Sequence, residues 1–157
     1  MSANFSAEGE WRWHNDRDAF VAEMEQFQRE REAQWAAESE RYHKRLKSLT
    51  WEQLLAETPF AGWDDDPAFP PRELVAAARE RIRAAVMELQ SLGPKPKKAA
   101  VRAVLKACVQ SFNDMDAAFG PIIETTVRED ICEALEELAF VAKHKSLAEE
   151  IAEWRNW

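Results

Sequence analysis

Glycine and proline are scarce in this chain, and this scarcity constrains its fold more than any other feature. The 157 residues contain only four glycines and seven prolines, and nearly all of them lie in the segments 58–71, 93–97 and 120–121. Because glycine and proline mark turns and chain breaks, the long stretches without them favour a few long helices over many short strands. We therefore expect an all-α helical bundle of four to six helices, with a long N-terminal helix and no sheet.

Apolar residues support this interpretation because they recur every three or four positions. The clearest stripe predicts a helix over 98–119 and consists of Val101, Leu105, Cys108, Phe112, Met115 and Phe119. The other expected helices span 16–47, 51–57, 71–92, 127–144 and 147–155. Capping boxes, in which a Ser or Thr precedes a Glu or Gln by three residues, start at Thr50, Thr126 and Ser146.

Size and composition predict one soluble domain over residues 1–157, in which residues 1–15 form an extended N-terminal arm. The formal net charge of −8 disfavours direct binding of nucleic acid or of an anionic membrane surface. No apolar run approaches the roughly 20 residues of a membrane-spanning helix. The two cysteines, Cys108 and Cys132, are too few for a disulfide framework and indicate free thiols in a reducing, cytoplasmic compartment.

Charge is distributed unevenly along the chain. Residues 72–106 contain nine Lys or Arg against three Glu, whereas residues 114–137 contain eight acidic residues and one Arg. Two interpretations stay open at this point. Neighbouring helices place the two blocks side by side so that they compensate each other, or the acidic block forms an outward surface for a basic partner.

The expected helix 127–144 favours the second interpretation. With Ile131 turned toward the core, a step of 100° per residue places six side chains on the opposite side or on its flank: Glu129, Asp130, Glu133, Glu136, Glu137 and Phe140. An aromatic ring surrounded by carboxylates is typical of an interface anchor inside a charged rim. Alternatively, Phe140 packs beneath the N-terminal segment or beneath the closing residues 154–157.

The loop at 58–71 repeats this combination of aromatic and acidic residues. It contains Trp63, Asp64, Asp65 and Asp66. The spacing of a calcium-binding EF-hand loop is missing, so we expect a partner contact here and no metal site. Neither a phosphate-binding glycine loop nor a hydrolase or metalloprotease motif occurs, so we expect no catalytic residues and no cofactor.

Residues 111–139, together with the ending AEEIAEWRNW, resemble small acidic helical immunity proteins encoded beside bacterial polymorphic toxins. The features that carry the resemblance are Phe112-Asn113, Ile123-Glu124-Thr125, Arg128-Glu129-Asp130 and the terminal Glu-Trp-Arg-x-Trp. The resemblance covers about a quarter of the chain. It implies a protein that docks on a toxin and occludes its active site without catalysing a reaction.

From these observations we expect an immunity-type protein that neutralises a cognate, basic toxin through the acidic helix face and the Trp63–Asp66 loop. A toxin that attacks nucleic acid would offer a basic groove to such a surface. A first alternative is an adaptor or structural protein that self-associates through the long first helix, using Phe20, Met24 and Phe27. A second is a metal- or thiol-dependent enzyme. The sequence leaves monomer and homodimer undecided.

Overall fold

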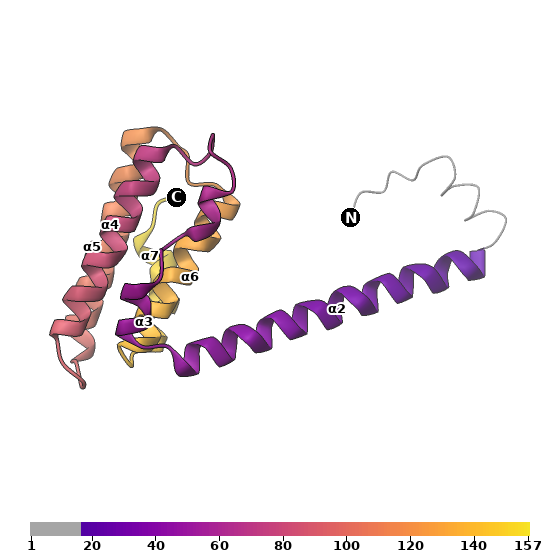
Figure 1. Ribbon diagram of the computed structural model, residues 1–157, viewed down its shortest axis with the longest axis horizontal. Coiled ribbons are helices and arrows are strands. Elements are labelled where there is room, and N and C mark those ends of the chain that lie inside the picture. The colour runs from indigo at the N-terminus through magenta and orange to yellow at the C-terminus, as the bar shows by residue number, and fades with distance from the viewer. Residues whose placement is uncertain (1–16) are drawn as a thin grey trace. The chain divides into compact units, whose positions relative to one another are not determined.

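The computed structural model describes residues 17–157, and all regular secondary structure in this range is helical (Figure 1). This confirms the predicted all-α class. The chain separates into two compact units, one ending at Arg45 and the other spanning Leu46–Trp157. The prediction of a single domain over residues 1–157 stays a prediction, and the helix bundle lies within the second unit. The expected N-terminal arm, with Trp11 and Trp13, lies outside the described residues.

Helix α2 (Arg17–Ser48) differs from its predicted bounds by one residue at each end. Leu46, close to its C-terminal end, is the only buried residue of this helix. Local side-chain pairs accompany the exposed part, including a Glu40–Lys44 ion pair at 3.7 Å and a 3.1 Å hydrogen bond from Gln26 to Glu30. The middle of the helix, residues 31–38, is exposed throughout.

Three helices enclose most of the hydrophobic core of the second unit: α4 (Arg72–Ser91), α5 (Lys98–Phe119) and α6 (Thr125–Val141). Helix α5 has the bounds that the sequence predicted, because Gly120, with a φ of 83°, ends it at a backbone conformation that other residues rarely adopt. The predicted stripe lies at the centre of the core, where Val101, Leu105, Cys108 and Phe112 have no exposed surface.

Shorter elements complete this unit, namely α3 (Trp51–Ala56), the 3-10 helices η1 (Ala61–Asp64) and η2 (Lys145–Glu150), and α7 (Ile151–Trp154). Of the three predicted capping boxes, the one at Thr50 is confirmed, because its Oγ1 accepts a 3.2 Å hydrogen bond from the Gln53 amide. The boxes at Thr126 and Ser146 were wrong. Helix α6 begins one residue before Thr126, and the cap of η2 is His144.

The C-terminal segment is attached to α5 by polar contacts. The buried Asn113 side chain donates to the Trp154 carbonyl at 3.0 Å and accepts from the Asn156 amide at 3.1 Å. Arg102 donates to both carboxylate oxygens of Glu150, at 3.0 and 3.2 Å, which joins α5 to η2. These contacts hold the C-terminal segment against the helix that forms the centre of the core.

Candidate partner-binding surface

The loop between α3 and α4 is anchored to α6 by a buried tryptophan. Trp63 has only 6% of its surface exposed, and its ring stacks on Phe60 with centroids 4.1 Å apart. Its Nε1 donates a 2.8 Å hydrogen bond to Oδ2 of Asp130 on α6. The apolar ring is thus removed from water while its polar N–H keeps a partner, the usual condition for burying a tryptophan. This single side chain fixes the aspartate-rich loop beside α6.

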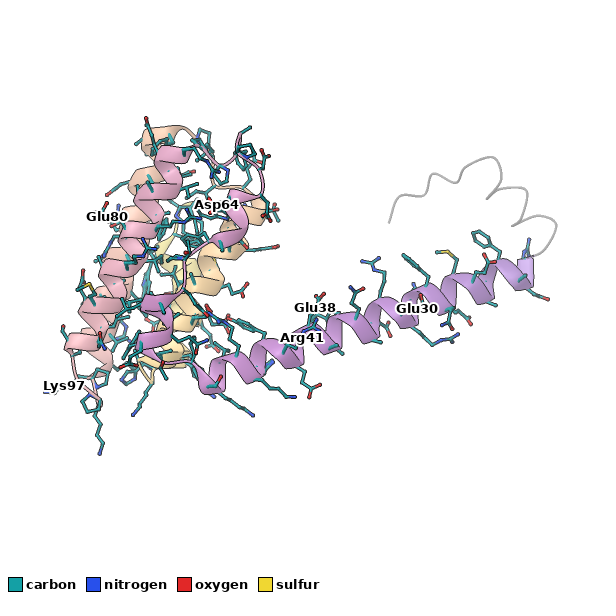
Figure 2. The ribbon with its side chains drawn as sticks, in the orientation of Figure 1. Glu30, Glu38, Arg41, Asp64, Glu80 and Lys97 are labelled. Atoms are coloured by element: carbon teal, nitrogen blue, oxygen red, sulfur yellow. The ribbon has the colours of Figure 1, made fainter. Side chains whose placement is uncertain are left out.

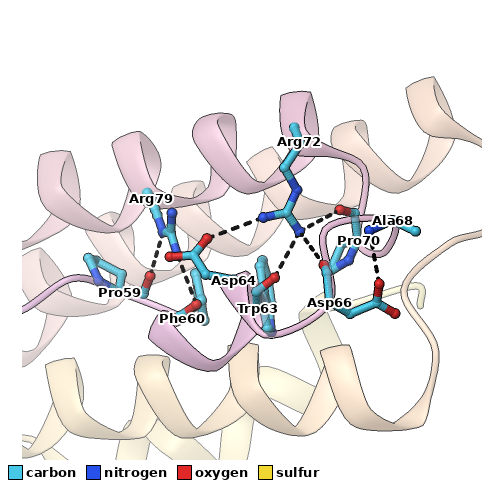
Figure 3. A network of polar contacts seen from close by, with 9 residues as sticks. All are labelled: Pro59, Phe60, Trp63, Asp64, Asp66, Ala68, Pro70, Arg72 and Arg79. Atoms are coloured by element: carbon cyan, nitrogen blue, oxygen red, sulfur yellow. Dashed lines mark hydrogen bonds and ion pairs between the residues drawn. The ribbon is translucent and has the colours of Figure 1, made fainter.

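Two arginines of α4 hold the same loop from its other side (Figure 3). Arg79 donates to Asp64 at 3.0 Å and to the carbonyls of Pro59 and Phe60 at 2.8 and 3.1 Å. Arg72 also donates to Asp64, at 3.2 Å. The hydrogen bond from Arg79, together with the charges of both arginines, lowers the pKa of Asp64 below its ordinary value although desolvation opposes this shift. Asp64 therefore stays ionised, and its carboxylate is bound by the two arginines.

Arg72 also binds the part of the loop that leads into α4. Its Nη2 donates to the carbonyls of Trp63, Asp66 and Pro70 at 2.8, 3.1 and 2.9 Å. The side chain of Asp66 accepts a 2.9 Å hydrogen bond from the Ala68 amide, which closes a local turn. Three backbone carbonyls converging on one guanidinium give this exposed segment a defined shape. The two arginines escaped sequence reasoning, although their spacing of seven places both on one side of α4.

The carboxylates that remain exposed come from two elements. Asp65 and Asp66 lie in the loop after η1, and Glu129, Glu133 and Glu136 lie on α6. Steps of three and four residues make the three glutamates neighbours on the helix surface, and Glu133 follows Asp130, the acceptor for Trp63, by three residues. We call Asp65, Asp66, Glu129, Glu133 and Glu136 the acidic face. The Trp63–Asp130 hydrogen bond attaches the loop with its two aspartates to the helix with the three glutamates.

Several predicted binding residues are less exposed than the sequence indicates. Trp63 and Glu137, with 6% and 8% of their surfaces exposed, are buried and do not offer their side chains to a partner. Asp64 is engaged by two arginines, and Asp130 is partly buried against Trp63. The prediction failed for Asp130 because helical periodicity describes one helix alone. It does not show that a loop distant in the sequence covers the flank of α6 that carries Asp130.

Phe140 is partly buried. It is absent from the apolar side chains that form the core of the second unit or pack directly against it. The spacing of four residues places it beside Glu136, at the C-terminal side of the acidic face. The sequence predicts an outward-facing interface anchor at this position, whereas the structure shows a partly buried ring.

Four arginines of the basic segment 72–106 form ion pairs with carboxylates outside the acidic segment. These pairs run from Arg72 and Arg79 to Asp64, from Arg81 to Glu88, and from Arg102 to Glu150. All three acidic partners lie outside residues 114–137.

The two thiols are poorly suited to nucleophilic chemistry. Burial raises the pKa of Cys108 to about 12, and burial also raises the pKa of Cys132 although Arg155 and Arg128 lie near it. Both thiols are therefore largely protonated at neutral pH, whereas the reactive form of a cysteine is the thiolate. Within residues 17–157, no group of three or more His, Cys, Asp or Glu residues is arranged to hold a metal ion.

Comparisons of the chain with models of protein families, with curated proteins and with solved structures gave no match. In the part of the chain that the structure describes, no helix is both long enough and apolar enough to span a membrane.

Proposed function

We propose that this chain is a non-enzymatic binding protein that neutralises a cognate, basic bacterial toxin by docking on it through the acidic face. The observation that carries this proposal is the Trp63–Asp130 hydrogen bond at 2.8 Å. It attaches the loop that carries Asp65 and Asp66 to α6, the helix that carries three further exposed carboxylates.

The order of the loop supports a binding role. Arg72 and Arg79 occupy the carbonyls and the Asp64 carboxylate, while Asp65 and Asp66 stay exposed on a loop of defined shape. Binding to a shaped loop costs less conformational entropy than binding to one that must first become ordered. A pre-arranged set of charges also accelerates encounter with a basic partner and selects against acidic ones.

The step from a basic partner to a toxin rests on the resemblance of residues 111–157 to immunity proteins. Within that stretch, Asn113 and Asp116 serve the fold, because Asn113 binds the C-terminal segment and Asp116 accepts from the amides of Ile122 and Ile123. Glu129, by contrast, is exposed. A toxin that cleaves or modifies nucleic acid fits best, because its substrate groove must attract phosphates and would equally attract carboxylates.

Co-expression and a binding footprint test this function. The product of the neighbouring reading frame is expressed alone and with this chain, and the purified complex is compared with the free chain by hydrogen–deuterium exchange. We expect growth arrest that the chain relieves, and slower exchange in residues 61–68 and 125–141. A non-toxic neighbour, an absence of binding, or a footprint that spares both segments would contradict the proposal.

A further inference from the structure

The Arg128 side chain on α6 is partly buried and has no ion-pair partner in the described part of the chain. Many charged side chains project from the helices and turns into solvent, as Figure 2 shows for Glu80 and Lys97. The Nε atom of Arg128, by contrast, is buried without a hydrogen-bond partner. None of the ion pairs within residues 17–157 involves this side chain. A buried N–H donor without an acceptor destabilises the folded chain, so native proteins normally supply one.

Trp157, in the C-terminal segment, has a second donor of this kind. Its indole Nε1 is buried and also has no hydrogen-bond partner, whereas a buried tryptophan N–H usually has one. The segment is fixed by the Asn113 side chain, which binds the Trp154 carbonyl and the Asn156 amide. The Trp157 ring packs against the hydrophobic core. The fold therefore sets the position of this indole.

Arg155 places a guanidinium group beside the same indole. Its Nη1 donates to the Trp157 carbonyl at 3.0 Å, and its guanidinium carbon lies 5.5 Å from the centroid of the Trp157 ring. No carboxylate forms an ion pair with Arg155 in the part of the chain that the structure describes. A neutral carbonyl is thus the acceptor for one of its N–H groups, and its charge is not balanced by a direct partner.

The Cys132 thiol relates the two arginines to one flank of α6. Cys132 follows Arg128 by four residues, which makes the two side chains neighbours on the helix surface. Burial raises the pKa of the thiol, whereas the charges of Arg155 and Arg128 lower it, and the charge of Glu136 raises it by less. The C-terminal segment therefore brings Arg155 to the flank of α6 that carries Arg128, and positive charge prevails there.

We propose that Arg128, Arg155 and Trp157 form a binding site for a phosphate group. Two guanidinium groups without carboxylate partners match the charge of a phosphate, about −1.5 to −2 at neutral pH. Its oxygens can accept from Nε of Arg128, from Nε1 of Trp157 and from further N–H groups of Arg155. A carboxylate, with one charge and two oxygens, fits this set of donors less well. The phosphate is either the free ion or part of a phosphate monoester.

An NMR titration of the isotope-labelled full chain with inorganic phosphate tests the site. The indole N–H of Trp157 gives a signal of its own, which the Trp157→Phe variant assigns. We expect a saturable shift of this signal with a dissociation constant at or below about 1 mM. We expect Arg128→Gln and Arg155→Gln each to weaken binding at least tenfold. Arg83→Gln, at an exposed position of α4, removes the same charge and should leave the affinity within twofold of the wild type.

Two results would overturn the proposal, namely a Trp157 signal that phosphate does not shift in a saturable way, and equal affinities of the three glutamine variants. Thermal unfolding gives a second readout if Arg128→Gln does not fold. Phosphate should then raise the unfolding midpoint of Arg83→Gln more than that of Arg155→Gln, because only the former retains the site. Equal rises would contradict the proposal.

Other ligands test the chemistry of the site. Acetate should bind at least tenfold more weakly than inorganic phosphate, and equal or tighter binding of acetate would contradict a phosphate site. Phenyl phosphate distinguishes the two sources. Tighter binding than that of inorganic phosphate supports a monoester as the ligand, and weaker binding supports the free ion. These titrations contain no partner protein, so their results are independent of toxin binding.

Discussion

Nε1 of Trp63 donates a 2.8 Å hydrogen bond to Oδ2 of Asp130, a residue 67 positions away in the sequence. Both residues belong to the segments that the sequence assigned to partner binding, but their side chains are hydrogen-bonded to each other. They therefore place the exposed carboxylates of the acidic face and do not themselves form its outer surface.

Removing the acceptor of this bond tests its contribution to stability. Asp130→Ala leaves the buried Trp63 N–H without a partner, which costs about 1–3 kcal/mol of the free energy of unfolding. Asp130→Asn retains an oxygen that can accept the same hydrogen bond, so we expect a loss below about 1 kcal/mol. Urea denaturation of the two variants measures the difference. Equal losses in both variants would show that the Trp63 N–H does not depend on this acceptor.

Arg79 is the more deeply buried of the two arginines that bind the loop. Its Nε donates to the Pro59 carbonyl, and its side chain is 17% exposed, compared with 43% for Arg72. Arg79→Lys keeps the charge but loses the planar set of donors, so we expect a loss of about 1–3 kcal/mol in unfolding free energy. Arg83→Lys, on the exposed side of α4, is the control and should change stability by less than about 0.5 kcal/mol. An equal loss for both lysine variants would contradict this role.

The Arg102–Glu150 pair predicts a dependence of stability on pH. The hydrogen bond from Arg102 and its charge lower the pKa of Glu150 below the ordinary value of 4.5. The stabilisation is therefore complete above pH 4.5 and is lost as the pH falls below it through the pKa of the folded state. We expect Glu150→Gln to be less stable than the wild type at neutral pH, and the difference to shrink below pH 4.5. A difference that stays constant down to acidic pH would exclude this linkage.

The two cysteines should differ sharply in their reaction with a disulfide reagent. The Cys108 thiol has no exposed surface, and burial raises its pKa to about 12. We expect only Cys132 to react in the folded chain, more slowly than a free thiol, and both to react in denaturant. The Cys132→Ser variant is the control and should show no reaction until it unfolds. Rapid modification of Cys108 in the folded state would contradict its place in the core.

The sequence predicts the helices well where their signals are local. The apolar stripe of α5 and the Gly120-Pro121 pair define that helix at both ends, since periodicity and a helix stop require no information from distant residues. The Thr50 cap is equally local. The Thr126 box fails because α6 begins at Thr125, with Glu124 as its cap residue. In the turn before it, Asp116 of the preceding helix accepts from the amides of Ile122 and Ile123.

The acidic face is predicted in part for the same reason. Glu129, Glu133 and Glu136 are exposed as the helical periodicity indicates, because the core side of α6 is defined by its own apolar residues. The burial of Trp63 and Glu137 depends on contacts between distant segments, which no local pattern encodes. A run of three aspartates indicates a solvated turn, and it does not show that Arg72 and Arg79 will bind one of them.

The affinity for the proposed toxin partner, measured by calorimetry with charge-reversed variants, tests the proposed role of the acidic face most directly. The test variant combines Glu129→Lys, Glu133→Lys and Glu136→Lys. The control combines Glu80→Lys, Glu149→Lys and Glu153→Lys, which change the net charge equally at exposed positions outside the acidic face. We expect the test variant to bind at least about 100-fold more weakly and the control to bind within about threefold of the wild type. Equal affinities of the two variants would contradict the account.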